Sequence, residues 1–134
     1  MSGPLAVFGL LELSALARHE ETQPEHLAAL IREIEQDGEL RQPIVVDRHT
    51  LVILDGHHRV AALRDLGRTL VPVYLVDYGD PAIAVFPRRA NVEVTKESIV
   101  QSGLLDRPYP PKTSRHVLPG ALPARPTPLG RLRP

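Results

Sequence analysis

Three short runs of β-branched and aliphatic residues between positions 44 and 76 constrain the fold more than any other feature. The runs at 44–47 and 51–54 are separated only by Arg48-His49-Thr50, so they predict a β-hairpin. The third run, at 71–76, predicts another strand. Between the hairpin and this strand lies a helical pattern that stops at Gly67 and contains Val60, Ala61, Leu63 and Leu66.

A longer helix is predicted before the hairpin. Thr22 and Glu25 form the pattern of a capping box, and Pro24 is tolerated in a first turn. Asp37-Gly38 ends a run of apolar residues at helical spacing, namely Leu27, Leu30, Ile31 and Ile34. With a strand segment before Arg18 and a short helix at 95–102, the order is strand, helix, hairpin, helix, strand, helix, which predicts an α+β domain.

The composition limits the class of protein. The chain has 134 residues, of which 43% are hydrophobic and 4% aromatic, so we expect one compact domain with a core of aliphatic side chains. No apolar stretch approaches the roughly 20 residues that span a bilayer, and residues 1–16 lack the pattern of a signal peptide. We therefore expect a cytoplasmic protein without a membrane partner. The absence of cysteine excludes disulfides, thiolate metal sites and cysteine nucleophiles.

Charge and proline divide the chain into two parts. Residues 1–106 hold all 16 acidic residues and 10 of the 16 Lys and Arg, whereas residues 107–134 hold the other 6 and no acid. An acidic body argues against a dedicated duplex-DNA partner. The second part also carries 8 of the 14 prolines. We therefore predict a domain at 1–118 and a disordered or extended tail at 119–134 that supplies no packed helix or strand.

Polar residues are concentrated at the junction between the strand ending at Leu54 and the following helix. Asp55, Gly56, His57, His58 and Arg59 follow that strand directly. A helix N-terminus attracts anions, glycine permits close backbone approach, and arginine suits phosphate or carboxylate, so the junction predicts phosphate binding. The alternative is that Asp55 only caps the helix, Arg59 pairs with it and both histidines are solvated. A metal site is less favoured, because neighbouring histidines diverge in direction and no His-rich ligand spacing is present.

Two further clusters carry chemical groups. Arg18-His19-Glu20-Glu21 precedes the first helix, and a carboxylate there that faces Asp55 would be a candidate general base. The second cluster begins at Pro111 and comprises Lys112, Thr113, Ser114, Arg115 and His116, a composition that suits an anion. Taken alone, each cluster is also consistent with a solvated charged segment.

These residues resemble the ParB/sulfiredoxin-like fold superfamily. The resemblance rests on His19-Glu20, Pro43 to Asp47, Val52 to Arg59, Leu66-Gly67 and Val71-Pro72-Val73. The His-His-Arg form of the loop, Tyr74 to Tyr78 and Pro110 to His116 are similar to free L-serine kinases, which phosphorylate serine to O-phospho-L-serine with ADP or ATP. The resemblance covers roughly residues 8–118 and implies a small mixed sheet with flanking helices.

The resemblance also implies roles for individual residues. Glu20 would deprotonate the serine hydroxyl, and Asp55 would hold the substrate or the metal-bound phosphates. His58 and Arg59 would contact phosphate. The motif from Lys112 to His116 would face the phosphoryl group and L-serine, with Ser114 replacing the usual second threonine. Mg²⁺ is expected with the nucleotide, although its ligands are unknown.

The chain is shorter than several members of that family. Part of the usual pocket is therefore predicted to be missing or to be supplied by a second subunit, as in a homodimer. Two other functions remain open: a ParB-like nucleotide-binding regulatory or DNA-associated module, and a nuclease or other activity. Repair of the sulfiredoxin type needs a catalytic cysteine, and the sequence has none.

Overall fold

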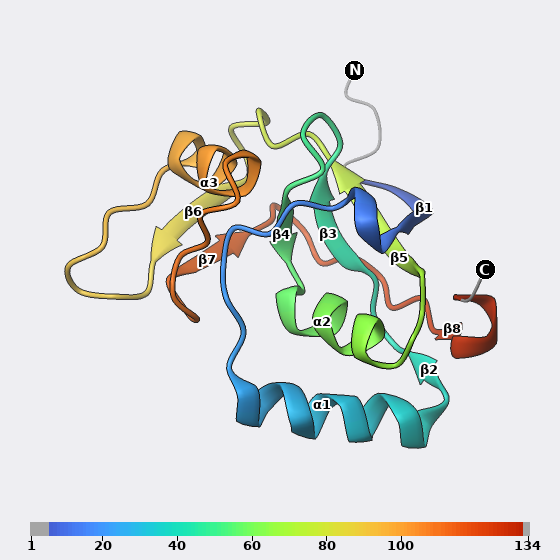
Figure 1. The fold of residues 1–134 in the computed structure, drawn as a ribbon. Coiled ribbons are helices and arrows are strands. Elements are labelled where there is room, and N and C mark those ends of the chain that lie inside the picture. The colour runs from blue at the N-terminus through green and yellow to red at the C-terminus, as the bar shows by residue number, and fades with distance from the viewer. Residues whose placement is uncertain (1–5, 133–134) are drawn as a thin grey trace.

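The computed structural model describes residues 6–132, and a four-stranded mixed sheet forms its centre (Figure 1). The strand order is β1-β5-β3-β4, in which β3 and β5 are parallel and the other neighbours antiparallel. The predicted α+β fold with a small mixed sheet is therefore confirmed, including the hairpin. The strands are β1 (Ala6–Glu12), β3 (Ile44–Asp47), β4 (Ile53–Asp55) and β5 (Leu70–Val76).

Alternate side chains of the sheet enter two apolar clusters, as strand geometry requires. Val46 and Ile53 pack in the cluster that also contains residues of α1 (Pro24–Asp37) and α2 (His57–Asp65). Val45, Val52 and Leu54 pack in the other cluster with Ile83, Val94 and Ile99. Figure 1 shows α1 and α2 together below the sheet, with a smaller lobe beside the β4 edge.

The start of α1 differs from the prediction. The helix begins at Pro24, its N-cap residue is Gln23, and no side chain caps it, so the predicted capping box of Thr22 and Glu25 is wrong. The chain is extended at Gln23, which leaves Thr22 one residue too early to cap the helix. The end is as predicted, because Gly38 adopts a left-handed conformation at φ +71°.

Gly56 determines the turn from β4 into α2. Its φ is +116°, and a Cβ there would lie 2.5 Å from Cγ2 of Ile44, so a larger residue is excluded both by conformation and by space. The helix starts at His57, earlier than the apolar pattern indicates, and places His57, His58 and Arg59 in its first turn.

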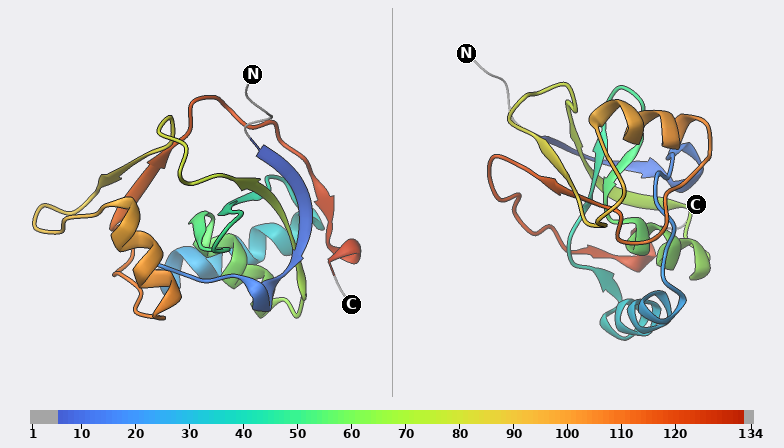
Figure 2. Two further views of the ribbon diagram at one scale, coloured as in Figure 1. Left: turned by 90° about the horizontal axis from the view of Figure 1, so that it is seen from above. Right: turned by 90° about the vertical axis from the view of Figure 1, so that its left-hand side faces the viewer.

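The smaller lobe contains a strand pair that the sequence analysis did not predict. β6 (Ala84–Pro87) and β7 (Ser114–Val117) form an antiparallel pair, so the cluster from Lys112 to His116 leads into and occupies a strand. The predicted short helix is α3 (Lys96–Leu104), and Thr95 and Ser98 form its capping box. Figure 2 shows this lobe projecting from the sheet, opposite the end that carries β8.

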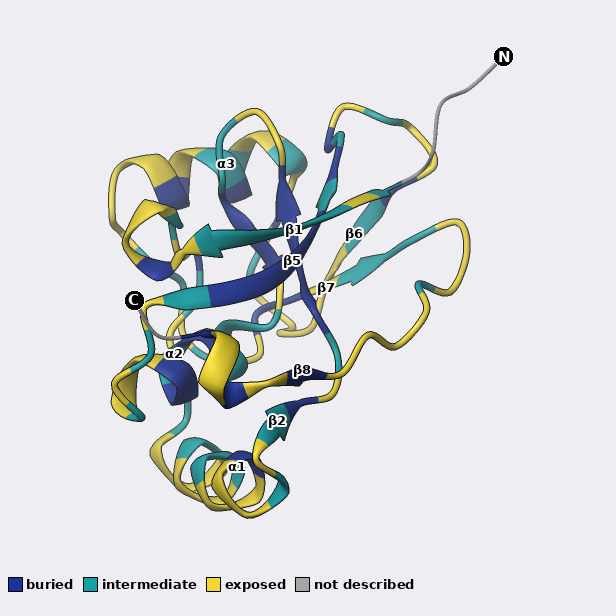
Figure 3. Cartoon of the chain, turned by 90° about the vertical axis from the view of Figure 1, so that its right-hand side faces the viewer, coloured by how far each residue is buried: buried dark blue, intermediate teal, exposed yellow. Residues whose placement is uncertain are grey.

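The prediction that residues 119–134 supply no packed element is wrong for residues 119–132, and residues 133–134 lie outside the described part of the chain. β8 (Thr127–Pro128) pairs with β2 (Glu39–Leu40), and the short helix η2 (Leu129–Arg131) follows it. Leu129 and Leu132 are buried in the cluster beneath the sheet (Figure 3). Two leucines spaced by three residues are enough to anchor a segment whose prolines exclude regular helix, since each buried leucine contributes about 1.5–3 kcal/mol. Among residues 6–132, no helix is long and apolar enough to cross a bilayer.

Candidate active site

The segments predicted to carry chemistry meet in one cleft of about 420 Å³. One side is formed by α1, α2 and the end of β4, and the other by β7 and the residues before it. The residues facing it include His19, Glu20, His26, Leu30, Asp55, Gly56, His57, His58, Arg59, Arg88, Lys112, Ser114, Arg115 and His116. Of the candidate site residues, only Thr113 does not line this cleft.

Glu20 is held by one of its two carboxylate oxygens. Oε1 accepts hydrogen bonds from the backbone N–H groups of Thr113 and Ser114, at 3.0 and 3.1 Å, and lies 3.3 Å from Oγ of Ser114. A parallel bridge between Glu20 and Tyr109 fixes the backbone. Among the described residues Oε2 has no hydrogen-bond partner. The carboxylate is therefore oriented by one oxygen and has the other available to accept a proton.

A buried histidine supports this arrangement. His19 is 1% exposed, and its Nδ1 lies 2.7 Å from the carbonyl oxygen of Ile53, so Nδ1 carries the proton. Its Nε2 then accepts from Oγ of Ser114 at 3.1 Å. Because a hydroxyl has one proton, Ser114 donates either to His19 or to Glu20 at any moment. Burial lowers the pKa of His19, although Glu20 and the carbonyl of Ile53 act in the opposite direction.

His57 and His58 point in different directions, as predicted for neighbouring residues. Nε2 of His57 accepts the backbone N–H of His19 at 3.2 Å, and the two rings make an edge contact. Nε2 of His58 accepts the backbone N–H of Gln23 at 2.9 Å, and its ring stacks on His26. Both side chains thus bind the segment that contains Glu20 and attach this segment to the start of α2.

Arg59 also binds the main chain. Nη1 donates to the carbonyl oxygens of Gln42 and Pro43 at 2.8 and 2.9 Å, and Nη2 lies 3.4 Å from Oδ2 of Asp55. The Asp55–Arg59 pair therefore exists, but Asp55 does not cap α2, which has no side-chain cap. The N–H groups of the first turn of α2 are available to an anion at the cleft.

The exposed charges of the cleft are mostly positive. Four Lys and Arg residues line it, against the two carboxylates of Glu20 and Asp55. Lys112 and Arg115 are exposed and form no ion pair among residues 6–132, whereas Asp55 is 69% exposed beside Arg59. Such a surface favours a ligand that carries several negative charges.

Four imidazoles of the cleft, those of His19, His57, His58 and His116, have a pKa lowered by burial and so favour their neutral forms. Burial, with further contributions from neighbouring histidines and Arg18, lowers the pKa of His57 well below its usual value. Burial and the proximity of His19 lower the pKa of His116 to about 3. The hydroxyl of Tyr78 lies 2.8 Å from Nε2 of His116, and burial raises the pKa of this phenol, so Tyr78 donates this bond. These groups position neighbours and do not add positive charge at neutral pH.

Metal ligands are few in this region. Within residues 6–132 no group of three or more His, Asp or Glu side chains is arranged to hold a metal. Asp55 has an exposed carboxylate, and one or two carboxylates are the usual protein ligands of a magnesium ion that is otherwise bound by phosphates and water. The residues present therefore fit a magnesium ion that arrives with a nucleotide.

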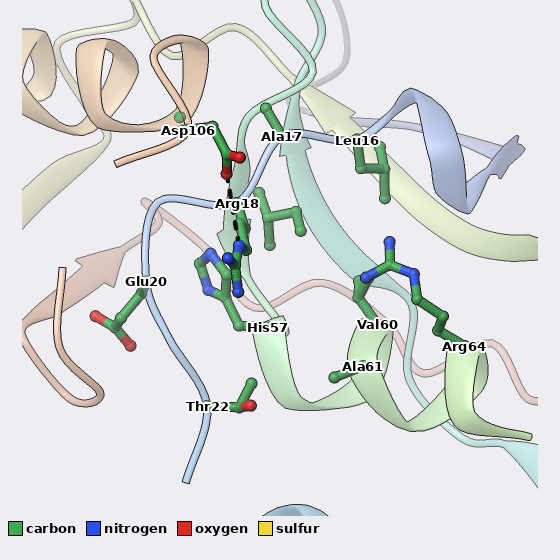
Figure 4. A pocket seen from close by; sticks show the side chains of 12 residues that line it. Leu16, Ala17, Arg18, Glu20, Thr22, His57, Val60, Ala61, Arg64 and Asp106 are labelled. Carbon is green, nitrogen blue, oxygen red and sulfur yellow. Dashed lines mark ion pairs between the residues drawn. The ribbon is translucent and has the colours of Figure 1, made fainter. Parts of the chain in front are cut away.

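A second cavity, of about 330 Å³, lies on the other side of the segment that carries Glu20 (Figure 4). It is bordered by Arg18, Thr22, His57 and Arg64, and Arg18 forms an ion pair with Asp106 at 3.7 Å. In Figure 4 the carboxylate of Glu20 points away from Ala61 and Arg64. Glu20 and His57 line both spaces.

Comparison with known proteins identifies the fold. The family described as the ParB N-terminal domain matches residues 10–92. The chain belongs to the ParB N-terminal domain family. This match includes the segments of Glu20 and Asp55 to Arg59 but ends before Lys112.

This ParB-family chain is also similar to individual proteins. It is 33% identical over 105 residues to an ATP-dependent L-serine kinase of Staphylothermus marinus, covering 67% of this chain and 41% of the relative. It is 29% identical over 80 residues to an ADP-dependent L-serine kinase of Thermococcus kodakarensis, covering 57% and 33%. The chain thus matches less than half the length of these relatives.

Solved structures agree in fold. A mutant of a free serine kinase in complex with AMP superposes with a TM-score of 0.86 at 16% identity, over 96% of this chain and 95% of that one. The predicted ParB/sulfiredoxin-like fold is confirmed. Because the superposition covers 96% of this chain, it includes the smaller lobe.

Several site residues escaped the sequence analysis of this ParB-family chain. His26 and Arg88 come from distant parts of the chain, and no local motif marks them. Tyr78 belongs to the stretch that carries the resemblance, but the sequence analysis gave it no role. His19 was part of a recognised cluster, but only the fold shows that its ring bonds to Ile53 and Ser114. Thr113 is fully buried and its hydroxyl donates to the carbonyl of Pro110, so its backbone and not its side chain serves the site.

Proposed function

We propose that this protein is a nucleotide-dependent kinase that phosphorylates free L-serine to O-phospho-L-serine. The observation that carries the proposal is Glu20. Its carboxylate is anchored through Oε1 to β7 and leaves Oε2 at a positively charged cleft beside the uncapped start of α2. A base next to an anion site is the arrangement that phosphoryl transfer to a hydroxyl requires. The names of the relatives support the same activity.

In this reaction Oε2 of Glu20 accepts the proton of the serine hydroxyl. The serine oxygen then bonds to the terminal phosphorus of the nucleotide, and the bond from that phosphorus to the leaving phosphate oxygen breaks. The products are O-phosphoserine with ADP from ATP, or with AMP from ADP. Lys112, Arg115 and the N–H groups of α2 stabilise the charge of the transferred group and of the leaving phosphate.

Asp55 has two roles in this proposal. As a ligand it would hold Mg²⁺, which when bound neutralises phosphate charge and orients the nucleotide. Its exposed carboxylate and Arg115 also form the pair of opposite charges that a zwitterionic amino acid needs, and both border the same end of the cleft. The acceptor is therefore assigned to the end near Asp55 and His116, and the nucleotide to the end near α1.

The test is direct. The protein is incubated with Mg²⁺, L-serine and either ATP or ADP, and O-phosphoserine and the nucleotide product are measured by mass spectrometry. We expect phosphoserine with at least one donor, and the better donor identifies the dependence. If neither donor produces phosphoserine while serine and nucleotide are in excess, the proposal is wrong.

A ParB-like nucleotide-binding module is the second candidate, because the family match itself covers residues 10–92. The orientation of Glu20 by residues 113 and 114 argues against this second function, because these two residues lie outside that match. Calorimetry with AMP, ADP and ATP separates the two functions. Nucleotide binding that neither serine nor phosphoserine affects, together with no turnover, would favour the regulatory module.

A further inference from the structure

A groove continues from the acceptor end of the cleft. It has a volume of about 460 Å³ and shares Asp55, Arg115 and His116 with the cleft. Beyond these three polar residues its walls are largely apolar, formed by Pro43, Val45, Val117, Leu118 and Leu122. We call residues 118–122, which form the outer wall, the strap, and the space behind them the strap groove.

Three contacts at and just beyond residue 122 attach the strap to the rest of the fold. The hydroxyl of Tyr74 donates to the carbonyl of Pro123 at 2.7 Å, and the guanidinium of Arg125 lies 3.7 Å from the ring centroid of Phe8. The amide of Gln42 donates to the carbonyl of Leu122 at 3.4 Å. β7 continues into the strap at one end, and β8 follows at the other. Because these contacts fix the strap, the groove is part of the folded structure.

The strap also has hydrogen-bonding groups available. Among residues 6–132, the backbone N–H groups of Gly120, Ala121 and Leu122 have no hydrogen-bond partner. Backbone N–H groups that are available beside pockets for side chains are one means by which proteins bind short peptides. Free serine would fill only the polar end of this space.

We propose that the strap groove is a second acceptor subsite, which binds an apolar residue joined by a peptide bond to the carboxyl group of the serine. This rests on the proposed function, and it extends the substrate class from free serine to short peptides with an N-terminal serine. Such a peptide keeps the ammonium group that Asp55 binds, and its first carbonyl oxygen still accepts from Arg115. The apolar residue that follows then lies against Val45 and Leu122.

The experiment compares three acceptors under the same conditions: L-serine, the dipeptide seryl-leucine, and leucyl-serine, whose serine lacks a free ammonium group. We expect the kcat/KM of seryl-leucine to be within about tenfold of that of serine, and that of leucyl-serine to be at least about a hundredfold lower. Because this comparison uses the unaltered protein, it does not depend on a variant that folds.

Leu122→Ala then tests the groove itself. Removing apolar contact from a half-buried wall should lower kcat/KM for seryl-leucine about tenfold and leave that for serine within about twofold. Leu104→Ala, at an exposed leucine of α3, is the matched control and should change neither. The melting temperatures of both variants are compared with that of the unaltered protein.

Two results would overturn the inference while the proposed function stands. One is turnover of serine with less than about a hundredth of that activity on seryl-leucine. The other is an equal loss for both acceptors in Leu122→Ala. If no acceptor is phosphorylated, serine included, the proposed function itself fails, and the groove loses its role with it.

Discussion

The two polar clusters that face each other across the cleft use their residues in different ways. At the start of α2, His57, His58 and Arg59 bind main-chain atoms of other segments, so these side chains hold the fold and leave backbone N–H groups for a ligand. On the opposite side, the backbone of Thr113 and Ser114 orients Glu20, and the side chains of Lys112 and Arg115 are exposed. The cluster at the start of α2 therefore stabilises the fold, whereas the cluster from Lys112 to His116 provides positive charge at the cleft.

The largest expected effect concerns Glu20, the proposed base, whose Oε1 accepts hydrogen bonds from the backbone of Thr113 and Ser114. Glu20→Gln should lower kcat about 100-fold to 10,000-fold, because general-base catalysis is lost, while nucleotide affinity stays within a few-fold. Steady-state kinetics with calorimetry measure both quantities. Glu21→Gln, at the exposed neighbouring carboxylate, is the control. Unchanged turnover in Glu20→Gln would remove Glu20 from the chemistry.

The next largest effect concerns the packing of the tail, which follows β7, on the core of the protein. Leu132→Ala should lower the free energy of unfolding by about 2–5 kcal/mol, because Leu132 is fully buried in the core. Urea denaturation measures the change. Leu122→Ala, in the same tail but half-buried, should cost less. Equal stability of Leu132→Ala and the unaltered protein would show that the tail does not pack as described.

Substitution of Arg59 tests whether the cluster at the start of α2 stabilises the fold. Arg59→Ala should cost about 3 kcal/mol of stability, since it leaves two carbonyl groups without their charged donor. Asp55→Asn should cost under about 1 kcal/mol, because that carboxylate is exposed. Chemical denaturation of both variants, with Arg59→Lys as an additional control, gives the comparison. A larger loss in Asp55→Asn would reverse the two roles.

Acid should destabilise the protein through its buried imidazoles. The pKa of His116 is about 3 in the folded protein and near 6.5 when unfolded, so between these pH values the unfolded chain binds more protons. The contribution of neutral His116 to the free energy of unfolding is therefore fully present above about pH 6.5. It falls by up to about 1.4 kcal/mol per pH unit as the pH decreases toward 3. Denaturation of the unaltered protein and His116→Gln at several pH values should show a shallower slope in the variant. Parallel slopes would exclude this contribution.

The smallest effect concerns the exposed cations. Lys112→Gln and Arg115→Gln should each weaken nucleotide or phosphoserine binding about tenfold at low salt, and less at high salt because exposed charges are screened. Calorimetry at two salt concentrations tests this. Arg107→Gln, at an exposed arginine that does not line the cleft, is the control. Equal affinity of all three variants at low salt would mean that these cations do not contact the ligand.

The local sequence was sufficient for much of the fold. Short uninterrupted runs of β-branched and aliphatic residues predict β3, β4 and β5, and the apolar spacing from Leu27 to Ile34 predicts α1. A special role for Gly56 can also be predicted, since a turn from a strand into a helix commonly needs a residue in the left-handed conformation. Many of the residues that line the cleft were found in the same way, because Glu20, Asp55 and Arg115 stand in conspicuous polar clusters, but His26 and Arg88 were not.

Only the tertiary structure decided how those residues are used. Whether His58 faces a phosphate or the start of α1 depends on where α1 packs, and whether Glu20 is oriented depends on a strand 93 residues away. Likewise, the prolines of the tail correctly exclude a regular α-helix, but they say nothing of the two leucines that dock β8 and the short 3₁₀ helix η2. Contacts between distant segments are set by packing of the whole chain, whereas periodicity and turn chemistry act over a few residues. The sequence by itself therefore determined the α-helices and the strands of the central sheet, and the tertiary structure decided the pairs β6–β7 and β2–β8 and the roles of the site residues.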